Sequence, residues 1–119
     1  MSFPSANKVF VLGKVEHDPE IREISGGKEK MGMRVRTTRS WTDKEFSTLH
    51  RVVVWGKMVD GLRGIKDGDY VAVDGRIDNR KYESNGETKW ITEIVANDVQ
   101  VYADRAAANG DQQEDDLPF

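Results

Sequence analysis

Short stretches of alternating apolar and polar residues recur along the first hundred positions, and turn-forming residues separate them. Residues 31–38 alternate cleanly, with apolar side chains on one side of an extended chain and Arg34 and Arg36 on the other. Residues 49–55 form the next expected strand, with His50, Val52 and Val54 on one side and Leu49, Arg51, Val53 and Trp55 on the other. Residues 9–12 are apolar at both parities, which indicates a strand covered on two sides, by the core and by a second chain or a ligand.

Turn signals divide the chain between these strands. Asp18-Pro19 and Gly26-Gly27 are expected to bracket a connecting segment, and two internal glycines limit residues 57–65 to a short helix. The Asn-Gly pair at Asn85-Gly86 is a strong signal for a tight hairpin turn. The expected strands are residues 8–15, 31–38, 49–55, 70–77 continuing into a hairpin of 76–83 and 88–95, and 99–102.

This order of elements predicts an all-β fold. Five strands, one short helix between the third and fourth strands, and a long hairpin before the fifth match the outline of an OB-fold, a five-stranded barrel. Residues 1–103 are expected to form this single domain. Residues 104–119 are rich in Ala, Asn, Gln and Asp and offer little that could be buried, so we expect a disordered acidic C-terminal tail there.

Charge is divided unevenly along the chain, whose formal net charge is -3. Residues 104–119 contain five acidic residues and one basic residue, which leaves a net charge of +1 for residues 1–103. A body so close to neutral cannot act as a general polycation. Any nucleic-acid site on it must therefore be a local basic stripe.

Composition argues against several classes of protein. Cysteine is absent, which excludes disulfides and thiolate metal sites. With His17 and His50 as the two histidines, no metal site is expected, and no catalytic or cofactor-binding arrangement stands out. No stretch approaches the roughly 20 apolar residues of a membrane helix, and no secretion signal is visible. We therefore expect a non-enzymatic, cytoplasmic protein without membrane association.

Arginines and aromatic residues share one side of several expected strands. A single nucleic-acid strand offers phosphates to cations and base faces to aromatic rings, and each stacked base contributes roughly 1–3 kcal/mol. The pattern also fits an ordinary solvated sheet face with aromatic residues in the core. The sets that share a side are Arg34 with Arg36, Arg51 with Trp55, and Arg76 with Arg80 and Tyr82.

Several blocks of sequence together resemble bacterial single-stranded DNA-binding proteins. They occur in the order typical of that family and cover nearly all of residues 1–103. The last five residues, Asp115-Asp116-Leu117-Pro118-Phe119, are similar to the acidic tip ending in Pro-Phe at the family's C-terminus. The blocks in the body are Asn7-Lys8-Val9, Leu12-Gly13, Asp18-Pro19-Glu20-Ile21-Arg22, Ser40-Trp41, residues 50–57, residues 68–77, Arg80-Lys81-Tyr82 and residues 92–96.

The resemblance implies an OB-fold that binds single-stranded DNA with tolerance for sequence, as a homotetramer. His50 would lie near a subunit interface. The implied base-stacking residues are Trp41, Trp55 and Tyr82, and the implied contacts to the DNA backbone are Arg34, Arg36, Arg51, Arg76 and Arg80.

The sequence departs from the family pattern in three places. Leu49 falls where well-studied members have another tryptophan, so one stacking residue is expected to be missing. Trp90 replaces a smaller aromatic residue, and we expect it to pack structurally. The linker at residues 104–114 is shorter than in many chromosomal members, which leaves a phage or plasmid member as an alternative.

The C-terminal tip has a chemistry of its own. Phe119 joins an aromatic ring to a free carboxylate, which suits an apolar pocket beside a cation on a partner. Asp115 and Asp116 add attraction to basic surfaces, weakened by salt. The resemblance implies docking of replication, recombination and repair proteins, in the cytoplasm and at the nucleoid of a bacterial or phage-infected cell. A merely solubilising tail is the alternative, which the apolar Leu-Pro-Phe ending disfavours.

Three other functions remain open from the sequence. An OB-fold of this kind could bind RNA, and a dedicated RNA reader would use the 2′-hydroxyl. The chain could instead be a protein-interaction module whose nucleic-acid face is vestigial. A nuclease is the third alternative.

Overall fold

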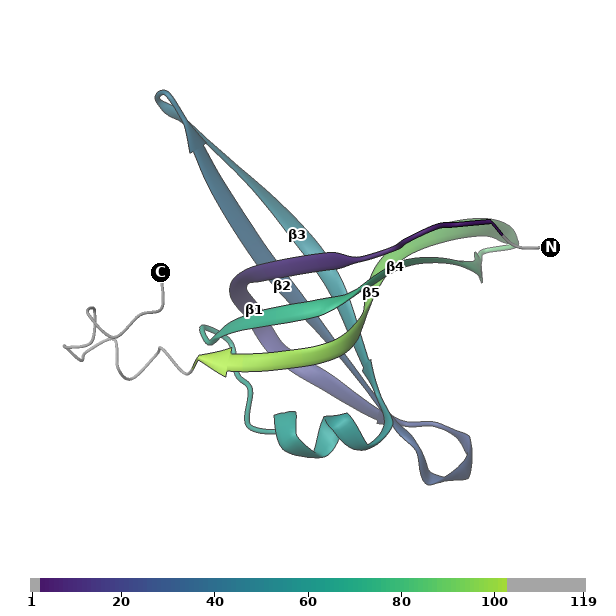
Figure 1. Cartoon of the computed structure of the whole chain (residues 1–119). Coiled ribbons are helices and arrows are strands. Elements are labelled where there is room, and N and C mark those ends of the chain that lie inside the picture. The colour runs from purple at the N-terminus through teal and green to yellow at the C-terminus, as the bar shows by residue number, and fades with distance from the viewer. Residues whose placement is uncertain (1–2, 103–119) are drawn as a thin grey trace.

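The computed structural model describes residues 3–102, and they form a closed five-stranded barrel in the order β1-β2-β3-β5-β4 (Figure 1). Neighbouring strands are antiparallel, except that β3 and β5 are parallel. This architecture confirms the expected five-stranded barrel with a short helix after the third strand. The elements are β1 (Val9–Glu23), η1 (Ser25–Gly27), β2 (Glu29–Trp41), β3 (Lys44–Trp55), η2 (Gly56–Leu62), β4 (Tyr70–Ser84) and β5 (Glu87–Tyr102), where η1 and η2 are 3-10 helices.

The hydrophobic core is formed by alternate residues of the strands, whose side chains point into the barrel. Met31, Met33 and Val35 point into the barrel from β2, and alternating valines of β3 and β4 meet them. Val59 and Leu62 of η2 join the same cluster, so the short helix closes one end of the barrel. The opposite parity of β2 and β3 must therefore face outward, and this parity carries the predicted arginines.

The first strand is longer than expected. Asp18-Pro19 does not end β1, because pairing with β2 resumes at Glu20 after a shift of register between Glu16 and Glu20. His17 has φ 69° within this bulge. A proline can be accommodated in such an irregularity because it interrupts the ladder anyway. The expected connecting segment is therefore mostly strand, and the turn to β2 lies at residues 24–28.

Two long hairpins extend beyond the core as arms (Figure 1). The first arm, residues 37–48, is formed by β2 and β3, which pair as far as Trp41 opposite Lys44. The sequence analysis missed this extension. The second arm, residues 78–92, is formed by β4 and β5. Its turn has positive φ at Asn85 and Gly86, as expected for an Asn-Gly hairpin turn.

Gly75 allows β4 and β5 to approach closely where the barrel bends. A Cβ added at this position would lie 2.2 Å from the carbonyl oxygen of Val95. The register of the β4–β5 ladder shifts at the same point, between Asp74 and Gly75. A glycine is therefore required here by close packing of backbone against backbone.

Candidate nucleic-acid interface

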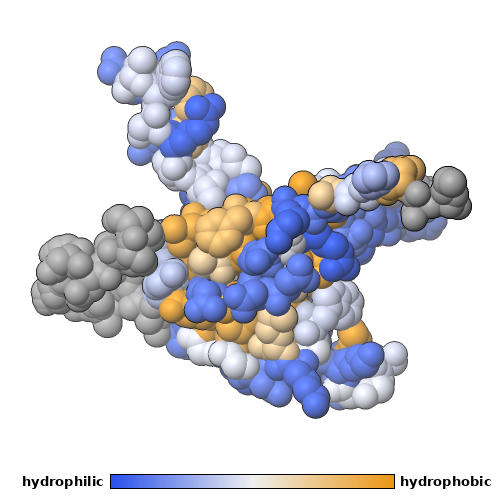
Figure 2. Space-filling model, viewed as in Figure 1, coloured by the Kyte–Doolittle hydropathy of each residue, from blue (hydrophilic) through white to orange (hydrophobic). Residues whose placement is uncertain are grey.

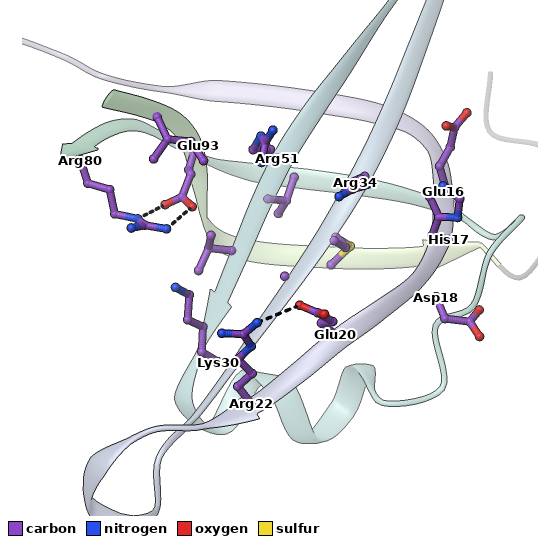
Figure 3. A pocket seen from close by; sticks show the side chains of 15 residues that line it. Glu16, His17, Asp18, Glu20, Arg22, Lys30, Arg34, Arg51, Arg80 and Glu93 are labelled. Atoms are coloured by element: carbon purple, nitrogen blue, oxygen red, sulfur yellow. Dashed lines mark hydrogen bonds and ion pairs between the residues drawn. The ribbon is translucent and has the colours of Figure 1, made fainter. Parts of the chain in front are cut away.

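An open groove of about 490 Å³ lies on the outer face of β1, β2 and β3, beside β5 (Figure 3). Cross-strand register arranges its side chains in rows over three strands. Gly32 and the buried Val53 form the middle of the surface, and charged residues lie on both sides of them. The rows are Glu16–Arg34–Arg51, Glu20–Gly32–Val53 and Arg22–Lys30–Trp55.

Arg34 and Arg51 are brought together by this register. They are direct cross-strand partners, both exposed, and both line the groove. Within residues 3–102, neither forms an ion pair or a side-chain hydrogen bond. Like charges placed directly opposite each other on adjacent strands repel. An anion between the two guanidinium groups would relieve that repulsion, and a phosphate is the anion that such groups bind best.

Arg36 and Arg80 differ from this pair because carboxylates hold both of them. Arg36 Nη2 donates to Glu16 Oε1 at 3.1 Å, Nε donates to the other oxygen, and Nη1 donates to Ser47 Oγ at 2.7 Å. The hydrogen bond from Arg36 holds the pKa of Glu16 below its usual value, and it raises the pKa of Arg36. Arg36 is thus a neutralised member of the predicted set.

Arg80 is paired with a carboxylate that is largely buried. Its Nε and Nη2 each donate to one oxygen of Glu93 at 3.1 Å, in the two-pronged arrangement visible in Figure 3. The Glu93 side chain is 9% exposed and that of Arg80 is 45% exposed. The hydrogen bond that Arg80 donates to Glu93 raises the pKa of Arg80. These two bonds use two of the five N–H groups of the guanidinium, which leaves three as further donors.

The fifth predicted arginine, Arg76, lies outside the groove. It is exposed on β4, opposite Val95 of β5, and it does not line the groove surface. The structure therefore separates the five arginines into an uncompensated pair, two ion-paired residues and one peripheral residue.

The three predicted stacking residues do not gather at one place. Trp55 does not line the groove, but its cross-strand partner Lys30 does. The Trp55 side chain is 46% exposed, and Lys30 Nζ lies 5.1 Å from its ring centroid. Trp41 is 64% exposed on the first arm, on the side of β2 opposite to Arg34. Tyr82 is 40% exposed on the second arm, on the same side as Arg80. DNA that contacted all three would have to extend from the groove onto both arms.

The expectation that Trp90 packs structurally is wrong. Its side chain is 65% exposed, because β5 at this point has left the barrel and no core lies beneath it. Leu49 is 41% exposed opposite Arg36, so the missing tryptophan is replaced by a surface aliphatic residue.

A model of the single-strand binding protein family matches residues 6–102. The chain belongs to this family. Single-stranded DNA-binding protein 1 of Chlorobaculum tepidum is 32% identical over 87% of this chain and 69% of its own length. A single-stranded DNA-binding protein of Rickettsia typhi is 34% identical over 76% of this chain and 66% of its own. Members of the family are non-enzymatic DNA-binding proteins, in agreement with the expectation of no catalysis.

A solved structure, the Plasmodium falciparum SSB complex with ssDNA, superimposes with a TM-score of 0.75. Its sequence is 30% identical, and the match covers 87% of this chain and 98% of that one. The similarity therefore extends over the whole barrel of that protein.

Two groups of predicted residues are not placed at an interface by the structure. His50 is half-buried, with Nε2 2.9 Å from Thr37 Oγ1, and its role between subunits stays a prediction. Asp115, Asp116, Leu117, Pro118 and Phe119 lie outside the described residues. In the part of the chain that is described, His, Asp and Glu form no group of three that could hold a metal ion, and no helix could span a membrane.

Glu93 is one of the groove residues that sequence reasoning did not predict. It is the single acidic residue in the otherwise uncharged run from Ile91 to Ala96. A carboxylate within a run of apolar strand residues is rarely buried without a cationic partner. That signal predicts a partner, but only the pairing of β4 with β5 identifies it as Arg80.

Proposed function

We propose that this protein binds and protects single-stranded DNA with tolerance for sequence, in replication, recombination and repair. The observation that carries the proposal is the uncompensated Arg34–Arg51 pair in an open groove, together with the exposed ring of Trp55, which pairs with the groove residue Lys30. Membership of the single-strand binding protein family supports it. We further propose that the protein acts in the cytoplasm, at the nucleoid of a bacterial or phage-infected cell.

The groove supplies the two contacts that any nucleotide can make. A phosphate bridges Arg34 and Arg51, and a neighbouring base stacks on the exposed ring of Trp55. Among residues 3–102, no Asn or Gln lines the groove, and the amides of these residues are suited to reading base edges. Binding through phosphates and ring faces is therefore expected to discriminate little among bases.

Carboxylates in the groove make binding a competition. Glu16, Glu20 and Glu93 are each paired with an arginine. The DNA phosphates must share these arginines with the carboxylates or displace the carboxylates from them. The affinity is therefore set by a few local cations, in keeping with the small net charge of residues 1–103.

A homotetramer is the proposed assembly, and an exposed apolar sheet face supports it. Register places Phe10, Leu12, Tyr70 and Tyr102 on the outer side of β1, β4 and β5, where Phe10 is 68% exposed. Hydrophobic side chains gather over the barrel body in Figure 2. Burial of these side chains against a second copy would remove them from water. Light scattering of Phe10→Asp should then report a smaller particle than the parent protein, and an unchanged mass would contradict this interface.

Recruitment of replication, recombination and repair proteins is proposed for the tip at residues 115–119. The chemistry that supports it is the apolar Leu117-Pro118-Phe119 segment preceded by two aspartates. Deletion of these five residues should abolish capture of such partners while oligo-dT binding is retained. Loss of both properties together would contradict a separate docking role.

Tryptophan fluorescence titrated with oligo-dT at two salt concentrations tests DNA binding directly. We expect quenching and an affinity that falls as salt rises. The absence of either response would overturn the proposal. Competition between matched DNA and RNA strands addresses the RNA alternative, because a dedicated RNA reader would prefer the strand that carries 2′-hydroxyls.

A further inference from the structure

Charge in the groove is divided between its two sides. Among the Asp, Glu, Lys and Arg residues of its lining, β1 contributes three acidic residues and one basic residue, and the other strands contribute four basic residues and one acidic residue. The first set is Glu16, Asp18, Glu20 and Arg22, and the second is Lys30, Arg34, Arg51, Arg80 and Glu93. Figure 3 shows Asp18 and Arg80 on opposite sides of the groove. An anion in the groove is therefore attracted toward one side and repelled from the other.

A bulge in β1 gathers the acidic residues of that side. Glu16 lies opposite Arg34, and the next paired residue, Glu20, lies opposite Gly32. The chain of β1 thus advances from residue 16 to 20 while β2 advances only from residue 34 to 32. The extra residues of a bulge are accommodated by a local bend of the strand. The carboxylates of residues 16, 18 and 20 are therefore crowded into a shorter length of the groove than a regular strand would give them.

These three carboxylates differ in how far cations neutralise them. Glu16 is ion-paired, whereas Asp18 Oδ1 accepts a hydrogen bond from the backbone N–H of Asp67 at 2.9 Å. Within residues 3–102, Asp18 forms no ion pair. Glu20 lies 3.7 Å from Arg22, and their side chains are 76% and 74% exposed. Asp18 and Glu20 therefore present negative charge at an exposed edge of the groove.

A single strand and a duplex present their phosphates differently to such a groove. A single strand has one row of phosphates, which the basic side can hold while the bases extend across the groove. A duplex has a second row, which lies roughly 6–12 Å away across its minor or major groove. It carries one negative charge per roughly 1.7 Å of its axis, about twice the density of one strand. A duplex held by Arg34 and Arg51 would therefore bring its second row of phosphates toward β1.

We propose that Asp18 and Glu20 determine the preference of this groove for single-stranded over double-stranded DNA, by repelling the second phosphate row of a duplex. The inference rests on the proposed DNA-binding function and assigns its selectivity to named side chains. Arg34 and Arg51 alone cannot make the distinction, because guanidinium groups bind the phosphates of either form. Repulsion of an unwanted partner by a like charge is a general source of specificity.

Affinities for matched single and double strands test the proposal in the double variant Asp18→Asn/Glu20→Gln. The asparagine retains an oxygen that can accept the hydrogen bond from Asp67. The probes are a dye-labelled oligonucleotide of about 16 residues, within the span of one OB-fold, and its duplex, crosslinked between the strands so that it cannot open. Fluorescence anisotropy at low salt gives both dissociation constants. We expect the ratio of duplex Kd to single-strand Kd to fall at least about five-fold below that of the parent protein.

Glu23→Gln/Asp98→Asn is the matched control. It makes the same two chemical changes and removes the same charge, at exposed positions that do not line the groove. Its ratio should equal that of the parent protein. An equal fall of the ratio in this control would show that net charge decides, and would overturn the inference.

Glu20→Gln alone provides a second variant. Its pair with Arg22 is exposed and weak, so folding is expected to be unaffected. Release of Arg22 strengthens attraction to single and double strands alike, and the ratio of the two constants removes that common effect. We expect the ratio to fall, but by less than in the double variant.

The outcomes separate this inference from the DNA-binding function. If the parent protein does not bind the single strand, the function itself fails. If the parent binds it and Asp18→Asn/Glu20→Gln gains equally for both probes, the carboxylates reduce binding in general and the inference is refuted. A ratio that stays at the parent value in both groove variants refutes it as well.

Discussion

Arg34 of β2 and Arg51 of β3 are direct cross-strand partners, and no carboxylate of residues 3–102 is paired with either. Two other predicted arginines are compensated, Arg36 by Glu16 and Arg80 by Glu93. The protein thus retains a local repulsion in its free form that a phosphate can relieve. We therefore expect the unpaired Arg34 and Arg51 to contribute more to DNA affinity than the ion-paired arginines do.

Replacement of Arg34 or Arg51 by alanine should weaken binding of oligo-dT and reduce its salt dependence. Each lost phosphate contact on a single strand lowers the slope of log affinity against log salt by about 0.7. Fluorescence titrations over a salt series measure both quantities. Arg63→Ala removes an arginine that is paired with Glu29 and Asp60 outside the groove, so its slope should match that of the parent. Equal slopes for all three variants would contradict a specific role of Arg34 and Arg51 in phosphate binding.

Glu93→Gln should have opposite effects on stability and on DNA binding. Loss of one charged acceptor at a buried position is expected to lower the free energy of unfolding by about 1–2 kcal/mol. The freed Arg80 guanidinium then becomes available to phosphate, so affinity for oligo-dT rises and the salt slope steepens. Urea unfolding and fluorescence titration give the two readouts.

Glu20→Gln is the matched control for that variant. It removes the same charge from the same groove, but its pair with Arg22 spans 3.7 Å between two highly exposed side chains. Such pairs contribute little to stability. A Glu93→Gln variant as stable as Glu20→Gln would show that the Arg80–Glu93 pair has no structural role.

Acid should remove the contribution of the Glu16–Arg36 pair to the stability of the folded protein. The pKa of Glu16 is lowered in the folded protein from its ordinary value of 4.5 by the Arg36 hydrogen bond, so folding favours the charged carboxylate. The stabilisation is present above pH 4.5 and is lost as the pH falls through the lower pKa of the folded state. The stability difference between the parent protein and Glu16→Gln should therefore be largest near neutral pH and vanish in acid. Urea unfolding at neutral pH and below the folded pKa measures this, and a difference independent of pH would refute it.

Gly75→Ala should destabilise the barrel by about 3 kcal/mol, because the added methyl group meets the carbonyl oxygen of Val95 and backbone must move. Gly32→Ala is the control within a strand, since its Cβ would meet nothing within 4 Å and its φ is not positive. Thermal or urea unfolding compares the two. Similar stabilities for both variants would show that β4 and β5 are not held as closely as the geometry indicates.

The sequence was sufficient to predict most of the strands, the helix after the third strand and the Asn85-Gly86 turn, because each depends on residues that are neighbours in the chain. The barrel was predicted from the order of these elements, which matches an OB-fold. It failed at Asp18-Pro19, where a local breaker signal was outweighed by pairing of residues 20–23 with β2. It also failed at Trp90, because alternation does not reveal where a strand leaves the core.

Alternation by itself determined that Arg34 and Arg36 share one side of a strand, as do Arg51 and Trp55. It could not determine which residues lie opposite them, because register is set by the packing of whole strands around a common core. Only the tertiary structure placed Arg51 against Arg34, Glu93 beside Arg80 and Lys30 over Trp55. Side-chain periodicity is a property of one strand, whereas charge compensation depends on distances between strands, and these arise only when the barrel closes.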